Sequence, residues 1–225
     1  MRFVSKIVAI AILGSLITAC SSTSEEWRVD GVIMGTVTKE KTEGGYRYGY
    51  HNLAGLLVRL EQRDEEHRFR DGPCIAINEY DSQKRFNEER HYDRFMKLTP
   101  CSEGYAKARC TYEDDGNHQI RKFSYYSTED RLIRRAGGYS IMIQEFTSDP
   151  LRLESLRFLD GNERPAPSTY KGVDGVTRIE VGHLKAVGDV PLIQAVFFDE
   201  HNIKLATQKW SGSTMHTSID ISGYY

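Results

Sequence analysis

Histidine, cysteine, serine and carboxylate side chains could carry catalysis in this 225-residue sequence, but none stands in a recognisable catalytic pattern. The seven histidines form neither H-x-H nor H-E-x-x-H, and none is spaced from a cysteine as a zinc ligand would be. No serine lies in a G-x-S-x-G motif, and no spacing rule singles out a glycosidase pair among the acids. We therefore expect no catalytic residue, no metal and no cofactor, and we expect that the chain is not an enzyme.

Tyrosine is the residue type that favours a binding function. The thirteen tyrosines include the bunched segments "YRYGY" and "YY". A tyrosine offers a large apolar body and a hydroxyl group at low entropic cost, which suits recognition surfaces. If the first segment is extended, Tyr46, Tyr48 and Tyr50 share one face. We take these three with Tyr125 and Tyr126 as candidate partner-binding residues, and ordinary packing within a sheet is the alternative.

The first 19 residues have the organisation of a secretory signal peptide. Arg2 and Lys6 precede an apolar run of 13 residues, 7–19. A helix needs about 20 residues to cross the hydrocarbon core, so this run is too short to be a membrane span. We expect residues 1–19 to be removed.

The end of that run, "ITAC", resembles the lipobox of bacterial lipoproteins, and a plain signal peptide with an incidental cysteine is the alternative. The resemblance implies a mature chain that begins at Cys20, which carries the acyl chains that hold it on a membrane. In Gram-negative members of the class, aspartate after the cysteine tends to retain the protein at the inner membrane. Ser21 stands there instead, which implies the outer membrane, with the chain facing the periplasm.

The totals describe a mid-sized, mildly acidic domain. The signal segment takes two of the 30 basic residues, so the mature chain has 28 against 32 acidic ones, a net charge of −4. This balance does not favour nucleic acid as a partner. We expect a flexible tether over 20–26 and a single domain over 27–225 with a long loop near 162–175. No internal repeat is evident.

Three cysteines remain in the mature domain once Cys20 is assigned to the anchor. An oxidising compartment permits one disulfide among Cys74, Cys101 and Cys110. Loop-closure entropy differs too little between the pairings to choose one. We expect Cys101–Cys110, because the intervening "SEGYAKAR" can turn back on itself; the alternative is that all three are unpaired.

Alternating apolar and polar residues predict a mainly-β fold. We expect an antiparallel β-sandwich or curled barrel of about eight to ten strands with one or two short helices. The expected hairpins pair 107–113 with 118–126, 139–147 with 151–161, and 191–200 with 203–210. The expected single strands are 26–40, 55–62, 177–184 and 215–222.

Two segments favour helix. In 127–138, a serine or threonine cap precedes acidic residues, and arginines precede a glycine stop. Residues 85–98 place Tyr92, Phe95 and Met96 on one helical face.

These features together indicate a lipid-anchored binding module with a protein partner. Our first hypothesis is an immunity or inhibitor protein that neutralises a toxic envelope-targeting enzyme, such as a secreted phospholipase or peptidoglycan hydrolase. The alternative is a structural or assembly lipoprotein of a secretion, pilus or outer-membrane machine. An enzyme whose site residues are distant in sequence is a third class.

Overall fold

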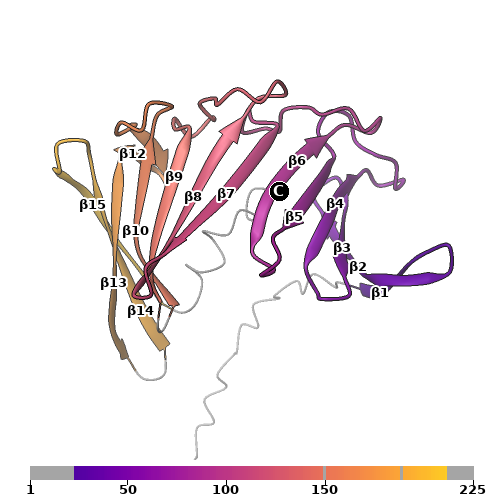
Figure 1. Ribbon diagram of the computed structural model, residues 1–225, viewed down its shortest axis with the longest axis horizontal. Coiled ribbons are helices and arrows are strands. Elements are labelled where there is room, and N and C mark those ends of the chain that lie inside the picture. The colour runs from indigo at the N-terminus through magenta and orange to yellow at the C-terminus, as the bar shows by residue number, and fades with distance from the viewer. Residues whose placement is uncertain (1–22, 149–150, 188–189, 212–225) are drawn as a thin grey trace, which may run out of the picture.

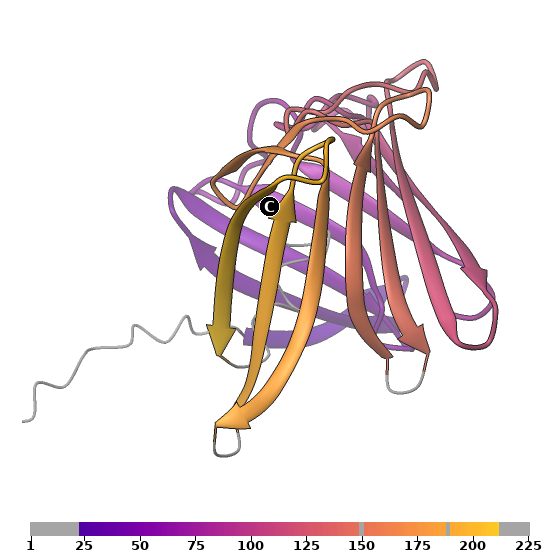
Figure 2. The ribbon, with the colours of Figure 1, turned by 90° about the vertical axis from the view of Figure 1, so that its left-hand side faces the viewer.

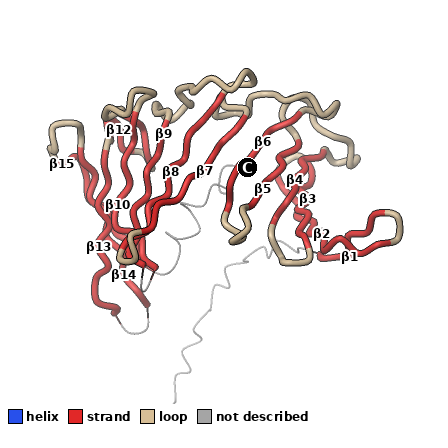
Figure 3. The backbone as a smooth tube through the Cα atoms, in the orientation of Figure 1, coloured by secondary structure: helices blue, strands red, loops and turns tan. Residues whose placement is uncertain are grey.

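The computed structural model describes residues 23–148, 151–187 and 190–211, and these residues form strands joined by turns and loops (Figure 3). They contain fifteen strands and no helix. The predicted mainly-β class is confirmed, but the strands outnumber the eight to ten expected and neither of the two predicted helices is present in this part of the chain. Within this part of the chain, no helix is long and apolar enough to cross a membrane. The predicted signal peptide and Cys20 lie outside the described residues.

Thirteen strands form one antiparallel sheet in the order β1 to β10 and then β13 to β15, while β11 and β12 pair separately. The sheet curls like an arch, and the longer loops gather at one end of the strands (Figures 1 and 2). The strands are β1 (Thr23–Val29), β2 (Val32–Thr42), β3 (Gly45–Asn52), β4 (Leu57–Arg63), β5 (Ile75–Tyr80), β6 (Phe86–Tyr92), β7 (Lys107–Asp114), β8 (His118–Tyr126), β9 (Ile141–Ser148), β10 (Leu151–Leu159), β11 (Ser168–Tyr170), β12 (Val173–Val176), β13 (Arg178–Val187), β14 (Val190–Phe198) and β15 (Lys204–Ser211).

The three predicted hairpins are confirmed as β7–β8, β9–β10 and β14–β15. Segment 26–40, predicted as one strand, contains the hairpin β1–β2, because Asp30 and Gly31 adopt positive φ and reverse the chain. β1 starts at Thr23, inside the predicted tether. The predicted loop near 162–175 contains β11 and part of β12, and the predicted strand 215–222 lies outside the described residues.

The predicted helix over 127–138 is wrong, although its predicted cap exists. The Ser127 hydroxyl accepts the backbone N–H groups of Glu129 at 3.1 Å and Arg131 at 3.3 Å, as a helix cap would accept the N–H groups of its first turn. Asp130 then takes a φ of 60°, a left-handed conformation that a helix does not tolerate. The chain therefore returns beside β8 instead of continuing as a helix.

The predicted helix over 85–98 is also wrong. Its first part is strand β6, and its last part is a tight turn from Asp93 to Lys97. Met96, the fourth residue of that turn, has a φ of 59°. The periodicity that suggested a helix arises because a strand with alternating burial runs directly into this turn.

One five-residue turn occurs nine times among the described residues, and it reveals a repeat that was not evident in the sequence. In each copy the first residue donates its N–H to the carbonyl of the fifth, and the fourth donates its N–H to the carbonyl of the first. The fourth residue always has positive φ. The copies begin at Asn52, Asp64, Asp81, Asp93, Cys101, Ser127, Arg135, Asp160 and Asp199.

A side-chain oxygen at the first position closes most of these turns. It accepts the N–H groups of the third and fifth residues, the pattern of an Asx or ST turn. The turns with this acceptor begin at Asn52, Asp64, Asp81, Asp93, Ser127, Asp160 and Asp199. The turns that begin at Cys101 and Arg135 have glycine at the left-handed position instead.

Four larger corners repeat around these turns, after β4, β6, β8 and β10. In each, the second-last residue of the strand donates its N–H across the corner to a residue that precedes the next long strand. The four bonds are Gln62 to Cys74 at 2.7 Å, His91 to Ala106 at 2.9 Å, Tyr125 to Ser140 at 3.1 Å and Phe158 to Thr177 at 2.9 Å. We call these segments the first, second, third and fourth corner.

The corners carry an aromatic row that covers one face of the sheet, which we call the apolar face. Neighbouring ring centroids in the row lie 4.8 to 5.8 Å apart, a favourable spacing for edge and tilted contacts. Its members are His91, Tyr105, Tyr125, Tyr139, Phe158 and Tyr170. Below the row lies a core of Phe123, Leu156, Ile179, Ala195 and Phe197, all nearly fully buried.

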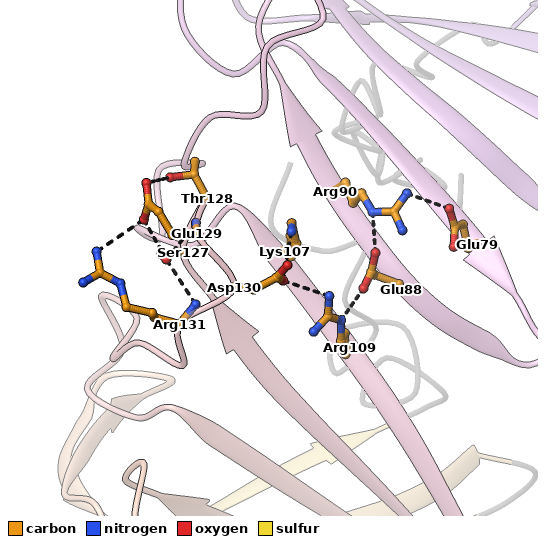
Figure 4. Close-up of polar contacts among 10 residues, drawn as sticks. All are labelled: Glu79, Glu88, Arg90, Lys107, Arg109, Ser127, Thr128, Glu129, Asp130 and Arg131. Carbon is orange, nitrogen blue, oxygen red and sulfur yellow. Dashed lines mark hydrogen bonds and ion pairs between the residues drawn. The ribbon is translucent and has the colours of Figure 1, made fainter.

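The opposite face, which we call the charged face, carries a chain of ion pairs (Figure 4). The chain crosses β5, β6 and β7 through Glu79, Arg90, Glu88, Arg109, Asp130 and Lys107. Asp130, the left-handed residue of its turn, lies 2.8 Å from Arg109 and 2.9 Å from Lys107. Left-handed residues of three other turns also contact this face, at His67, Glu163 and Asn202. These contacts explain why the positions are not glycine despite the strain.

The predicted disulfide Cys101–Cys110 is absent, and both thiols are free. The chain does turn back after Cys101, but it closes within five residues, where Cys101 donates its N–H to Tyr105 at 2.8 Å. Strand β7 then carries Cys110 away from the corner, and five extended residues span about 16 Å. A disulfide needs Cα atoms within about 7 Å, so this pair cannot form one.

Replacing Asn52 tests the side-chain closure of the turn without changing a charge. Its Oδ1 accepts the N–H groups of Ala54 and Leu56, each at 3.0 Å. We expect Asn52→Ala to lower the free energy of unfolding by about 1 kcal/mol, as the loss of a comparable cap does. Asn52→Asp, which retains the acceptor, should lose much less. Urea denaturation measures both, and equal midpoints for the alanine variant and the wild type would show that the side chain does not close the turn.

Candidate functional site

The tyrosines of β3 form the centre of an aromatic and basic surface on the charged face. Tyr46, Tyr48 and Tyr50 are half-buried and alternate along an extended strand, so they share one face as predicted. The ring of Trp27, on the edge strand β1, packs edge-on against Tyr50 with centroids 5.4 Å apart. We call this set, with the cations around it, the tyrosine surface; it consists of Trp27, Lys39, Tyr46, Tyr48, Tyr50, Arg59, Arg63 and His67.

Cations and one imidazole hold these rings in place. The Lys39 ammonium lies 4.3 Å from the Tyr46 ring centroid, and the Arg63 guanidinium lies 5.2 Å from that of Tyr48. The ring of His67 stacks on Tyr46 with centroids 4.3 Å apart, and its Nδ1 lies 2.7 Å from the Tyr48 hydroxyl. His67 can do both because its left-handed backbone aims the ring back over the sheet.

Glu61 anchors the cations from below. Its side chain is only 4 % exposed and pairs with Arg59 at 2.8 Å and Arg63 at 2.6 Å. The Tyr50 hydroxyl donates to the same carboxylate at 3.3 Å. Burial and the Glu61 charge together raise the pKa of Tyr50, so this hydroxyl remains a donor across the physiological range. The surface therefore presents ordered rings and outward cations over a buried acid.

The other two candidate tyrosines lie elsewhere. Tyr126 is on the charged face at the end of β8, five strands from β3, with the Arg109 guanidinium 4.7 Å from its ring centroid. Tyr125 is on the apolar face and fully buried in the aromatic row, so it offers no surface to a partner here. Sequence reasoning also missed Trp27 and His67, whose places depend on pairing and turn geometry.

A second cluster of polar groups lies under the second corner. Glu89 and His91 are 2 % and 3 % exposed, and Glu89 Oε1 lies 2.9 Å from His91 Nε2. The Tyr105 hydroxyl donates to the same carboxylate oxygen at 3.3 Å. The side chain of His91 also hydrogen-bonds the Cys101 thiol. A pocket of about 140 Å³ opens here, and both His91 and Cys101 line it.

Desolvation lowers the pKa of His91, but the hydrogen bonds with Cys101 and Glu89 outweigh it and raise the pKa to about 9. In the part of the chain that the structure describes, no group of three or more possible ligands is placed to hold a metal ion. The chemistry available here is proton transfer and thiol chemistry.

Arg135 holds the second corner against the third. Its side chain is 3 % exposed, lies 2.8 Å from Glu103, and has its guanidinium 4.9 Å from the ring centroid of Tyr125 and 5.0 Å from that of Tyr139. Ala136 also donates its N–H to the Glu103 carbonyl at 2.8 Å. Corner loops distant in sequence are thereby joined into one rim.

The chain matches no protein-family model and no curated protein.

The raised pKa of His91 predicts a pH-dependent stability. The folded protein binds this proton more tightly than the unfolded chain, so the stabilisation is complete below a pH of 6.5 and is lost as the pH rises through about 9. We expect the free energy of unfolding, measured in urea across this range, to fall for the wild type. It should fall much less for His91→Gln. The control His118→Gln, at a half-exposed histidine, should behave as the wild type does; a wild-type curve that stays flat would contradict the assignment.

Proposed function

We propose that this protein is an outer-membrane lipoprotein that binds a protein partner through the tyrosine surface. In our proposal it is an immunity or inhibitor protein that neutralises a toxic envelope-targeting enzyme, such as a secreted phospholipase or peptidoglycan hydrolase. The observation that carries the proposal is the ordered set of half-buried tyrosines with Trp27, Arg59 and Arg63. Trp, Tyr and Arg are the residue types that dominate binding energy in protein interfaces.

The contacts within the surface favour tight binding, because rings already held in place lose little freedom when a partner docks. The Lys39 ammonium and the Arg59 and Arg63 guanidinium groups lie against rings, and the carboxylate that pairs with both arginines, Glu61, is buried. These three cations outnumber the acid that holds them. We infer a partner that presents acidic groups around an apolar patch.

The proposed anchor is close in sequence to this surface. Thr23 opens β1, and three residues from Cys20 span at most about 10 Å of extended chain. Trp27 lies on the same strand. An inhibitor held this near the bilayer meets an enzyme that arrives at the envelope at a high effective concentration.

The edges of the sheet favour the alternative, an assembly or structural lipoprotein. Within the described residues, β1 and β15 each pair with one strand only. Such edges can add a strand from another chain. Stable association with secretion, pilus or outer-membrane assembly proteins, and none with a toxic enzyme, would favour this alternative.

Binding to a toxic enzyme encoded beside this gene tests the inhibitor role. We expect Tyr48→Ala to weaken the complex by roughly 30-fold, corresponding to about 2 kcal/mol at a central aromatic residue. Phe95→Ala is the matched control, because Phe95 is 76 % exposed on a corner loop outside the surface. Calorimetry measures both, and survival of a deletion strain under the enzyme reports protection. The role is lost if the deletion does not sensitise cells and the purified proteins do not bind.

The anchor has its own test. Cys20→Ala removes the only sulfur at which the lipobox-like segment could be acylated. We expect the variant to leave the outer-membrane fraction and to lack the mass of the lipid, as measured by fractionation and intact mass spectrometry. A variant that still fractionates with the outer membrane would refute the lipoprotein assignment.

A further inference from the structure

The second corner differs from the other corners in the chemistry of its buried side chains. Glu89 lies two residues before the second-last residue of its strand. The other three corners have a buried apolar residue at this position, namely Leu60, Phe123 and Leu156. At the second-last position itself, His91 replaces the glutamine, tyrosine and phenylalanine of the other corners. The same backbone therefore folds with apolar or neutral groups at both positions.

Stability does not explain this exchange. A buried carboxylate and imidazole lose their hydration, and apolar residues of similar volume usually serve a core equally well or better. A local departure from an otherwise repeated pattern, with strongly perturbed ionisation in a pocket, is typical of a functional site. The third group, Cys101, stands where the third corner has Arg135.

The geometry aligns the three groups in order. Glu89 Oε1 lies 2.9 Å from His91 Nε2, and the imidazole also hydrogen-bonds the Cys101 thiol. Glu89 accepts a further bond from Tyr105, which fixes the carboxylate and hence the ring. A nucleophile paired with a base that a third group orients is the recurring arrangement of covalent catalysis.

The pocket decides the size of what could react. Its volume of about 140 Å³ is close to that of an engineered cavity known to hold benzene. Apolar walls come from Leu60, Ile75 and Ala76, and Gln62 also lines the pocket. Cys101 is only partly buried and lines this pocket.

We propose that Cys101, His91 and Glu89 form a nucleophilic thiol site that transfers short acyl groups from esters to water. The site is separate from the tyrosine surface and does not depend on the binding role.

The steps conserve atoms and charge. The Cys101 thiolate adds to the ester carbonyl carbon, the bond to the alcohol oxygen breaks, and the alcohol leaves with the proton of the His91 imidazolium. The neutral imidazole then takes a proton from water, whose oxygen attacks the thioester carbon. The acid is released, and the thiolate and imidazolium are restored. The pKa of His91, about 9, keeps the imidazole protonated at neutral pH, so it can supply the proton that the alcohol carries away.

The test uses the purified full-length protein with p-nitrophenyl acetate as the probe. We expect release of p-nitrophenolate and an acetyl thioester on Cys101, mapped by mass spectrometry. Cys101→Ser and His91→Gln should each lower the rate roughly 100-fold. His91→Gln is compatible with the fold because Gln62 stands at the same position of the first corner, and Glu89→Leu matches Leu60 in the same way.

Two controls separate this chemistry from a loss of folding. Cys110→Ser should retain the wild-type rate, because Cys110 is buried outside the pocket and burial raises its pKa to about 11. In the wild type, iodoacetamide should alkylate Cys101 much faster than Cys110, and His91→Gln should slow the reaction at Cys101. The urea midpoint of His91→Gln should match that of the wild type above a pH of about 9, where the wild type has lost the stabilisation from its protonated imidazole. Acylation at another residue, or an unchanged rate in Cys101→Ser, would overturn the proposal.

Discussion

The two backbone hydrogen bonds of the five-residue turn are the constraint on which the rest of this structure depends. A meander of thirteen strands exposes N–H and C=O groups wherever a strand ends, and buried groups of this kind require partners. The turn satisfies them within five residues, and a side-chain oxygen at its first position satisfies two more. The corners then continue the hydrogen bonding beyond the strand ends, which keeps successive hairpins in register.

The left-handed residue of the turn links this backbone rule to the surface. Glycine would relieve the strain at that position, yet Asp130 and His67 occupy it and make contacts on the charged face. The same backbone geometry thus orders an ion-pair chain at one corner and a ring of the tyrosine surface at another. A turn required for folding also positions the residues that we propose for recognition.

Local patterns predicted three hairpins correctly but missed β5 and assigned β6 to a helix. The alternation of apolar and polar residues identified the hairpins, and the spacing of Tyr46, Tyr48 and Tyr50 identified their shared face. Both signals are local, because side chains two residues apart in a strand point to the same face. The helix predicted from Ser127 was wrong because its sequence pattern fits two structures. A capping oxygen, followed by an acidic and a basic residue four positions apart, is compatible with the start of a helix and also with this turn. Recurrence of a polar acceptor followed four residues later by Arg or Lys, as in Asp64–Arg68 and Asp81–Arg85, was the signal that could have revealed the repeat.

The sequence by itself determined the mainly-β class, three of the hairpins and the common face of the β3 tyrosines, because each depends on neighbours within a few residues. Only the tertiary structure decided that Tyr125 is core, that Cys101 and Cys110 separate, and that Trp27 joins the tyrosine surface. It also brought Glu89 and Cys101 to the same imidazole. These contacts require the second corner to fold back over β6. Hydrogen bonds between backbone groups distant in sequence hold it there, and no local sequence pattern predicts them.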